Sequence, residues 1–260
     1  MIFSRFFKTP FARALEDYGR ERCSLTGEDL WIGLGPNPEY RREPVRAFPH
    51  PAKSLLFVAA PDADQASLID ALTKSREAGE VTTMMIGTSH DYANGRPKSL
   101  DMSATVSRLA KGHFPALENL SLGDMEQLFN GHRGFGRIGD ITGIFNAAPN
   151  LKDLSLHGQF SMSRSVRHDT LADLSAWLDE IGVSGGPVSQ ETITHLLSSS
   201  FPKLKEADLD LEEGDREIDY VIPDAFFEGG MPALTGFGMN CLAPGSAQRL
   251  AEWKAGRKIK

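Results

Sequence analysis

The sequence predicts an α/β solenoid, in which short parallel strands stack side by side and helical segments return the chain between them. Three observations predict it: a recurring Pro-x-Leu opening, an L-x-x-L-x-L pattern after that opening, and amphipathic stretches between the copies. Proline fits the start of a strand because the residue ahead of it is pushed out of the helical region, which ends the preceding helix.

Four segments share an opening of an apolar residue, proline, any residue and leucine. They start at Phe114, Ala148, Phe201 and Met231. When that leucine is counted as the first position, apolar residues recur at the fourth and sixth positions. The four sets are Leu117, Leu120, Leu122; Leu151, Leu154, Leu156; Leu204, Ala207, Leu209; and Leu234, Phe237, Met239.

The same pattern finds three further members that lack the proline. They are Val81, Met84, Ile86; Leu178, Ile181, Val183; and Leu55, Val58, Ala60. The openings then recur every 26–36 residues, in and slightly above the ~20–29-residue period of leucine-rich repeats. The longer intervals predict insertions within 87–113 and 125–147.

The spacing has a physical reason. Residues two apart on a strand point to the same face, so each segment presents apolar side chains that only stacked neighbours can bury. Five intervening segments are predicted to be helical: Gln65–Ala78, Leu100–Lys111, Ile138–Ala147, Gln190–Ser198 and Ser246–Lys254. A generic α/β sheet is the alternative, but it need not repeat a Pro-x-Leu opening.

Two stretches, Phe114–Asp124 and Ala148–Gly158, resemble a group of bacterial cytoplasmic leucine-rich-repeat proteins. The resemblance covers about residues 50–257. It implies a right-handed solenoid with parallel strands on the concave face and helices on the convex face, and it carries no catalytic residues across. The asparagine that many such repeats place at the ninth position is absent here. We expect residues 1–52 to form an N-terminal cap, and 53–260 to form the solenoid with a C-terminal capping helix.

Composition and charge limit which classes of partner the protein can be expected to bind. The formal net charge of −7 argues against nucleic acid, because phosphate binding needs a basic patch. No apolar run approaches the ~20 residues that would span a bilayer, and no signal peptide is evident, so no membrane is expected. The two cysteines, Cys23 and Cys241, are too few and too far apart in the chain for a disulfide framework, which favours the cytoplasm.

The outward strand positions predict the functional surface. These are the second, third, fifth, seventh and eighth positions, and from the third predicted strand onward they carry eight acidic residues and two basic ones, Lys152 and Lys205. The acidic ones are Glu118, Asp124, Asp153, Asp179, Glu180, Glu206, Asp208 and Asp210. Like charges on adjacent strands repel, so stability alone would not collect them there. We expect an acidic concave face that binds a basic protein, with His157 on the same face. A polar face that is merely solvated is the alternative.

A small cytoplasmic binder with an acidic face suggests an immunity protein that covers the basic active site of a toxin, with an adaptor or scaffold as the alternative. Binding anchors in the inserted loops could be Tyr92, Phe135 and Phe160, whereas Phe237 should belong to the core.

Enzyme hypotheses are weaker. Gly182–Gly186 matches the G-x-S-x-G elbow of a hydrolase around Ser184, but the only later histidine, His195, precedes the available aspartates, so the triad order fails. Gly134–Gly139 matches G-x-G-x-x-G but does not directly follow a strand. The seven histidines are scattered and no zinc motif occurs. We therefore predict a protein that is not an enzyme and needs no cofactor or metal.

Overall fold

The computed structural model has an α/β fold built on an open, mostly parallel sheet of eight strands. It describes residues 11, 14, 31–35, 54–58, 63–88, 101–124, 136–178, 186–211 and 219–257. The strands of the large sheet are β1 (Trp31–Gly35), β2 (Ser54–Val58), β3 (Thr83–Thr88), β4 (Asn119–Asp124), β6 (Asp153–His157), β8 (Asp173–Trp177), β9 (Glu206–Asp210) and β10 (Gly236–Met239). A small parallel pair, β5 (Arg137–Asp140) and β7 (Gln159–Ser161), lies apart from it.

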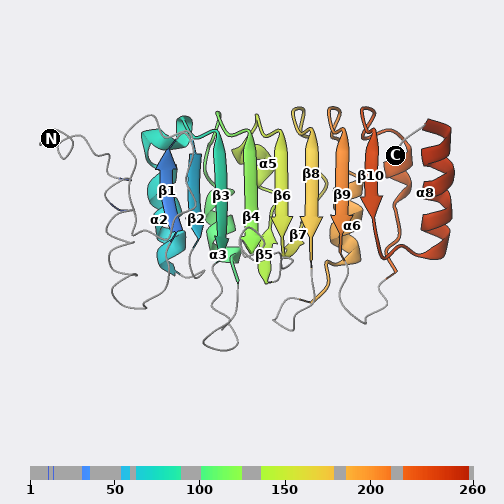
Figure 1. The fold of residues 1–260 in the computed structure, drawn as a ribbon, viewed down its shortest axis with the longest axis horizontal. Coiled ribbons are helices and arrows are strands. Elements are labelled where there is room, and N and C mark those ends of the chain that lie inside the picture. Colours follow the sequence, from blue (N-terminus) through green and yellow to red (C-terminus); the bar gives the residue numbers. More distant parts are fainter. Residues whose placement is uncertain are drawn as a thin grey trace, which may run out of the picture.

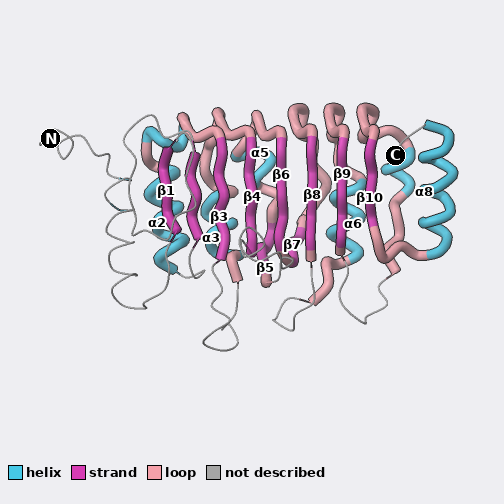
Figure 2. The backbone as a smooth tube through the Cα atoms, in the orientation of Figure 1, coloured by secondary structure: helices cyan, strands magenta, loops and turns pink. Residues whose placement is uncertain are grey.

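The strand order is the order of the chain. Each strand of the large sheet hydrogen-bonds to the strand that precedes it and to the strand that follows it in that sheet, as Figure 1 shows. Every pair is parallel except β1 and β2, which are antiparallel at the N-terminal edge. The parallel pairs need crossover connections, and the described helices of these connections lie on one side of the sheet (Figure 2).

One hydrogen-bond pattern recurs just before β4, β6, β8, β9 and β10. The amides of Lys152 and Asp153 both donate to the carbonyl oxygen of Glu118, at 2.7 and 3.0 Å. The amides of Ala172 and Asp173 donate in the same way to the carbonyl of Lys152. The carbonyl oxygens of Thr82, Ala172 and Lys205 accept the equivalent pairs at the other junctions. The start of each of these strands is thus fixed against the previous one, which keeps the strands in a constant register.

The fourth and sixth positions of the pattern fill the core. Leu120, Leu154, Leu174 and Ala207 are aligned in register across the sheet, and each is at most 4% exposed. The next aligned set, Leu122, Leu156, Ala176 and Leu209, is fully buried. The predicted core assignment of Phe237 is confirmed, since it is 3% exposed.

Helices cover one face of the sheet (Figures 1 and 2). They are α2 (Ala63–Thr73), a 3-10 turn (Arg76–Gly79), α3 (Ser103–Leu109), α5 (Ile144–Ala147), α6 (Gln190–Leu197) and α7 (Asp224–Phe227). Helix α8 (Pro244–Arg257) lies beyond β10, at the C-terminal edge of the sheet (Figure 1). Helix α6 begins where the Ser189 hydroxyl accepts the amide of Thr192 at 3.1 Å, and it buries Ile193, Leu196 and Leu197. Their spacing of three and four residues predicted this face.

Four of the five helix predictions are confirmed apart from their ends. The prediction over Ile138–Ala147 is wrong in its first half, where the chain forms β5 before the short helix α5. Gly139 of that segment has φ of +94°, a backbone region that a helix does not use.

Two strand predictions need correction. In the large sheet the strand next to β6 is β8 (Asp173–Trp177), whose repeat is opened by Leu171 and not by Leu178. The Ile181 and Val183 positions lie outside the described residues. In β2 the register aligns Leu55 with Met84 and Phe57 with Ile86, so Leu55 holds the fourth position of the pattern and not the first.

The C-terminal edge is closed by α8. Trp253 packs on Phe226, with ring centroids 4.9 Å apart, and Phe226 in turn contacts Phe237 of β10. The ammonium of Lys254 donates to the carbonyl of Phe237 at 3.0 Å. Among the described helices, none is both long and apolar enough to cross a bilayer.

Candidate functional site

The outward face of the sheet, opposite the helices, is the candidate site. Its side chains fall into three rows because the parallel register aligns equivalent positions on β4, β6, β8, β9 and β10. The first row is Asn119, Asp153, Asp173, Glu206 and Gly236. The second row is Ser121, Ser155, Ser175, Asp208 and Gly238. The third row is Gly123, His157, Trp177, Asp210 and then Asn240 just beyond β10.

The first row places three carboxylates on successive strands. Asp173 and Glu206 are exposed and Asp153 is half-buried. Burial raises the pKa of the Asp153 carboxyl, and the charge of Asp173 raises it further. Since neighbouring strands are about 4.8 Å apart, these groups repel one another. Within the described residues none of the three forms an ion pair.

The glycines of β10 make room for the carboxylates of β9. A Cβ atom at Gly236 would stand 1.7 Å from Glu206 Oε2, and one at Gly238 would stand 2.5 Å from Asp208 Oδ1. The Thr235 hydroxyl donates to Glu206 Oε1 at 3.1 Å. Both acidic side chains therefore lie above the glycines of β10, and both are exposed to solvent.

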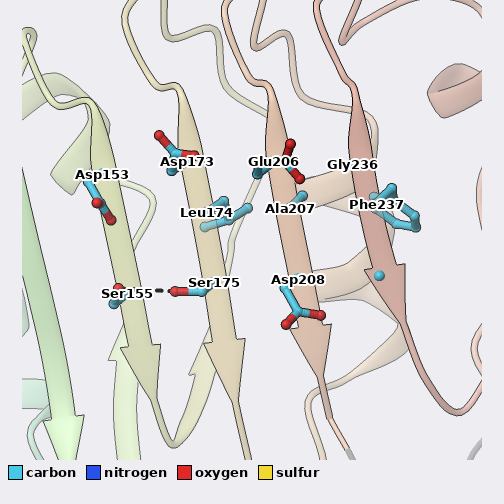
Figure 3. Close-up of a pocket in the computed structure, with 11 residues that line it drawn as sticks. Asp153, Ser155, Asp173, Leu174, Ser175, Glu206, Ala207, Asp208, Gly236 and Phe237 are labelled. Atoms are coloured by element: carbon cyan, nitrogen blue, oxygen red, sulfur yellow. Dashed lines mark hydrogen bonds between the residues drawn. The ribbon is translucent and has the colours of Figure 1, made fainter. Parts of the chain in front are cut away.

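The second row is neutral at its centre. The Ser175 hydroxyl donates to the Ser155 hydroxyl at 3.0 Å, as the dashed line in Figure 3 marks. Together with the first row these side chains line a shallow depression of about 630 Å³ across β6, β8, β9 and β10. Figure 3 shows Asp153, Asp173, Glu206 and Asp208 around it, so the depression is acidic and has no basic residue in its lining.

The third row adds two aromatic rings. His157 and Trp177 stack with ring centroids 4.9 Å apart and an interplanar angle of 29°. Nδ1 of His157 is buried and has no hydrogen-bond partner among the residues that the structure describes. Burial lowers the pKa of this imidazole to about 4, so the ring is neutral at physiological pH. On the next strand Asp210 Oδ1 accepts a hydrogen bond from Asn240 Nδ2 at 2.6 Å.

The charges that flank the rows are partly compensated. Lys152 Nζ lies 2.7 Å from Glu118 Oε1, which pairs one of the two predicted basic residues with a predicted acidic one. The first-row carboxylates on β6, β8 and β9 have no such ion pair among the described residues.

Six of the nine predicted site residues lie on or beside this face: Glu118, Asp153, His157, Glu206, Asp208 and Asp210. Asp124 is the last residue of β4, and its side chain is outside the described part. Asp179 and Glu180 also lie outside the described residues. They were assigned to a repeat opened by Leu178, whereas the strand at this place in the sheet is β8, whose repeat is opened by Leu171. Their predicted second and third positions are therefore held by Ala172 and Asp173.

The prediction missed Asp173 and Trp177. A signal for both existed, because Leu171-Ala-Asp-Leu-Ser-Ala repeats Leu151-Lys-Asp-Leu-Ser-Leu with changes only at the second and sixth positions, and the sixth stays apolar. The missing proline and the short 20-residue interval between the two leucines concealed it.

The other residues that the sequence singled out are either engaged in other contacts or lie outside the described part of the chain. Nδ1 of His195 hydrogen-bonds the carbonyl of Met162 at 2.8 Å, and Asp224 is paired with Arg249. Ser184 and Cys23 lie outside the described residues, as do Tyr92 and Phe135. Phe160 is wrong as a binding anchor because it is 1% exposed. Nowhere in the described ranges do three or more His, Cys, Asp or Glu side chains gather as a metal site.

Comparison with known proteins gives no family. No family model matches the chain, and no curated protein matches it. A crystal structure of a protein from Bacteroides fragilis is similar over 70% of this chain, with 18% sequence identity and a TM-score of 0.44. The chain spans about half of that protein, 51% of its length.

Proposed function

We propose that this chain is a right-handed leucine-rich-repeat solenoid whose outward sheet face binds a basic protein. Three observations support the solenoid: strand order in the large sheet equals chain order, the same pair of amide-to-carbonyl bonds recurs at the starts of β4, β6, β8, β9 and β10, and a Pro-x-Leu opening precedes four strands. Parallel strands joined by crossovers are right-handed in nearly all proteins.

The observation that carries the binding function is the first row. Three carboxylates on adjacent strands repel each other, and burial and the charge of Asp173 already disfavour the charged form of Asp153. Folding gains nothing from this arrangement, whereas a basic partner would turn the repulsion into attraction and would be steered towards the face. The same acidity disfavours nucleic acid.

The chemistry suits an immunity-type inhibitor in the cytoplasm, which would cover the basic active site of a toxin. An adaptor for a basic protein is the second candidate, because it would use the same face. A hydrolase that uses Ser184 is a third, weaker candidate, since His195 is held by a backbone carbonyl.

A pull-down from the native cell at low and high salt tests the binding function. The comparison is between wild type, Asp173→Asn/Asp208→Asn, and the control Glu228→Gln/Glu252→Gln. The control removes the same charge from exposed positions in the α7–α8 region. We expect a basic protein to bind wild type and the control, to dissociate at high salt, and to be lost with the outward-face variant. Equal capture by both variants would contradict the proposal.

A further inference from the structure

The third row differs in kind from the other two, because it holds aromatic rings beside carboxylates. His157 and Trp177 are register partners on β6 and β8, and their ring centroids are 4.9 Å apart. This distance matches the spacing of adjacent strands, about 4.8 Å, so the rings stack along the row. One face of Trp177 is therefore covered by His157, and the opposite face is directed towards β9.

Carboxylates stand on that side. Asp210 is the register partner of Trp177 on β9, and Asp208 lies two residues earlier on the same outward face. Asp208 is exposed, and Gly238 beside it leaves its carboxylate room to move. Asn240 holds one oxygen of Asp210. The partly exposed indole thus lies next to one carboxylate held in place and one that can adjust.

His157 supports this arrangement without adding charge. Its Nδ1 is buried and its ring is uncharged at neutral pH, because burial lowers its pKa to about 4. It can therefore keep the Trp177 ring in place by stacking on one of its faces, while a cation binds to the other face. A protonated imidazole in this place would repel that cation.

A planar cation fits this combination better than a compact one. Guanidinium stacks on an indole and at the same time forms parallel hydrogen bonds to a carboxylate in its own plane, whereas ammonium is a strongly hydrated point charge. We propose that the outward face selects an arginine side chain of its partner, with the guanidinium stacked on Trp177 and paired with Asp208. This inference rests on the proposed function, to which it adds the identity of the basic residue.

The test uses two defined probes, an oligo-arginine and an oligo-lysine peptide of equal length, and measures their dissociation constants by fluorescence anisotropy with the full chain. Wild type should bind the arginine peptide about five- to tenfold more tightly. Trp177→Leu should abolish that preference while keeping the affinity for lysine, and Trp177→Phe should retain part of it. Glu206→Gln should weaken both peptides by the same factor, because the first row recognises charge alone.

The outcomes separate the two proposals. If wild type binds both peptides equally and Glu206→Gln weakens both, the arginine site is overturned and the acidic binding face stands. A preference that survives in Trp177→Leu also overturns the arginine site. If neither peptide binds wild type at low salt, both proposals fall. The comparison of the two peptides with the wild-type chain does not depend on any variant. It therefore tests the arginine preference even if Trp177→Leu does not fold.

Discussion

The two faces of the large sheet are made by the same strands but obey different physical demands. On the helical side, Leu122, Leu154 and Leu156 are fully buried. The residues aligned with them on the neighbouring strands are all apolar. On the outward side, aligned positions hold carboxylates that repel one another, at Asp153 and Asp173 for example. The helical face is explained by stability, whereas the repelling carboxylates of the outward face are not, which is why we propose that a partner binds there.

The largest expected difference in stability is between substitutions at two adjacent residues of β6, one on each face of the sheet. Leu154→Ala removes a fully buried side chain from the middle of the core and should lower the free energy of unfolding by about 2–5 kcal/mol. Ser155→Ala, on the outward face, loses one hydroxyl contact with Ser175 and should cost less than about 1 kcal/mol. Urea denaturation measures both. Similar costs would mean that the two faces are not distinct.

A second effect concerns the close approach of β4 and β6 at the third row. Gly123 has φ of +113°, and a Cβ atom there would stand 2.0 Å from the carbonyl oxygen of His157. Gly123→Ala should therefore lower the free energy of unfolding by about 3 kcal/mol. Gly79→Ala is the matched control, because no atom lies within 4 Å of its added Cβ, and it should change stability by less than about 1 kcal/mol. Thermal unfolding followed by circular dichroism compares them, and equal melting temperatures would be evidence against the close approach.

The third effect depends on pH. The imidazole of His157 has a pKa of about 4 in the folded protein, against 6.5 ordinarily. Between these values the unfolded chain takes up a proton that the folded chain does not, so stability falls as the pH is lowered from about 6.5 to about 4. The loss attributable to His157 should reach about 2 kcal/mol, after partial exposure is allowed for.

His157→Phe isolates this contribution. The variant keeps a ring on Trp177 but cannot be protonated, so the stability difference from wild type should change across this pH range and stay constant above pH ~7. Carboxylates titrate in both proteins and cancel in the difference. Parallel stability curves from pH 7 to pH 4 would show that His157 is not buried as described.

The sequence predicted the helical face better than the outward face, for a physical reason. Core positions such as Leu120 and Leu154 must be apolar in every copy, so they recur visibly. Outward positions obey no such rule, and their assignment depends entirely on the register. One misplaced opening, Leu178 in place of Leu171, moved the predicted acids to Asp179 and Glu180 and concealed Asp173 and Trp177. The stacking of His157 on Trp177 depends on that same register.

The smallest effect on stability bears on the central claim, that the outward acids are there for a partner and not for the fold. Asp153→Asn/Asp173→Asn removes the repulsion within the first row at constant side-chain shape. The measurement is the free energy of unfolding at low salt together with the affinity for an oligo-lysine peptide, beside Glu228→Gln/Glu252→Gln. We predict stability that is unchanged or higher by up to about 1 kcal/mol, with weaker peptide binding than in the control variant. A fall in stability of more than about 1 kcal/mol with unchanged binding would contradict the claim, because the acids would then serve the fold.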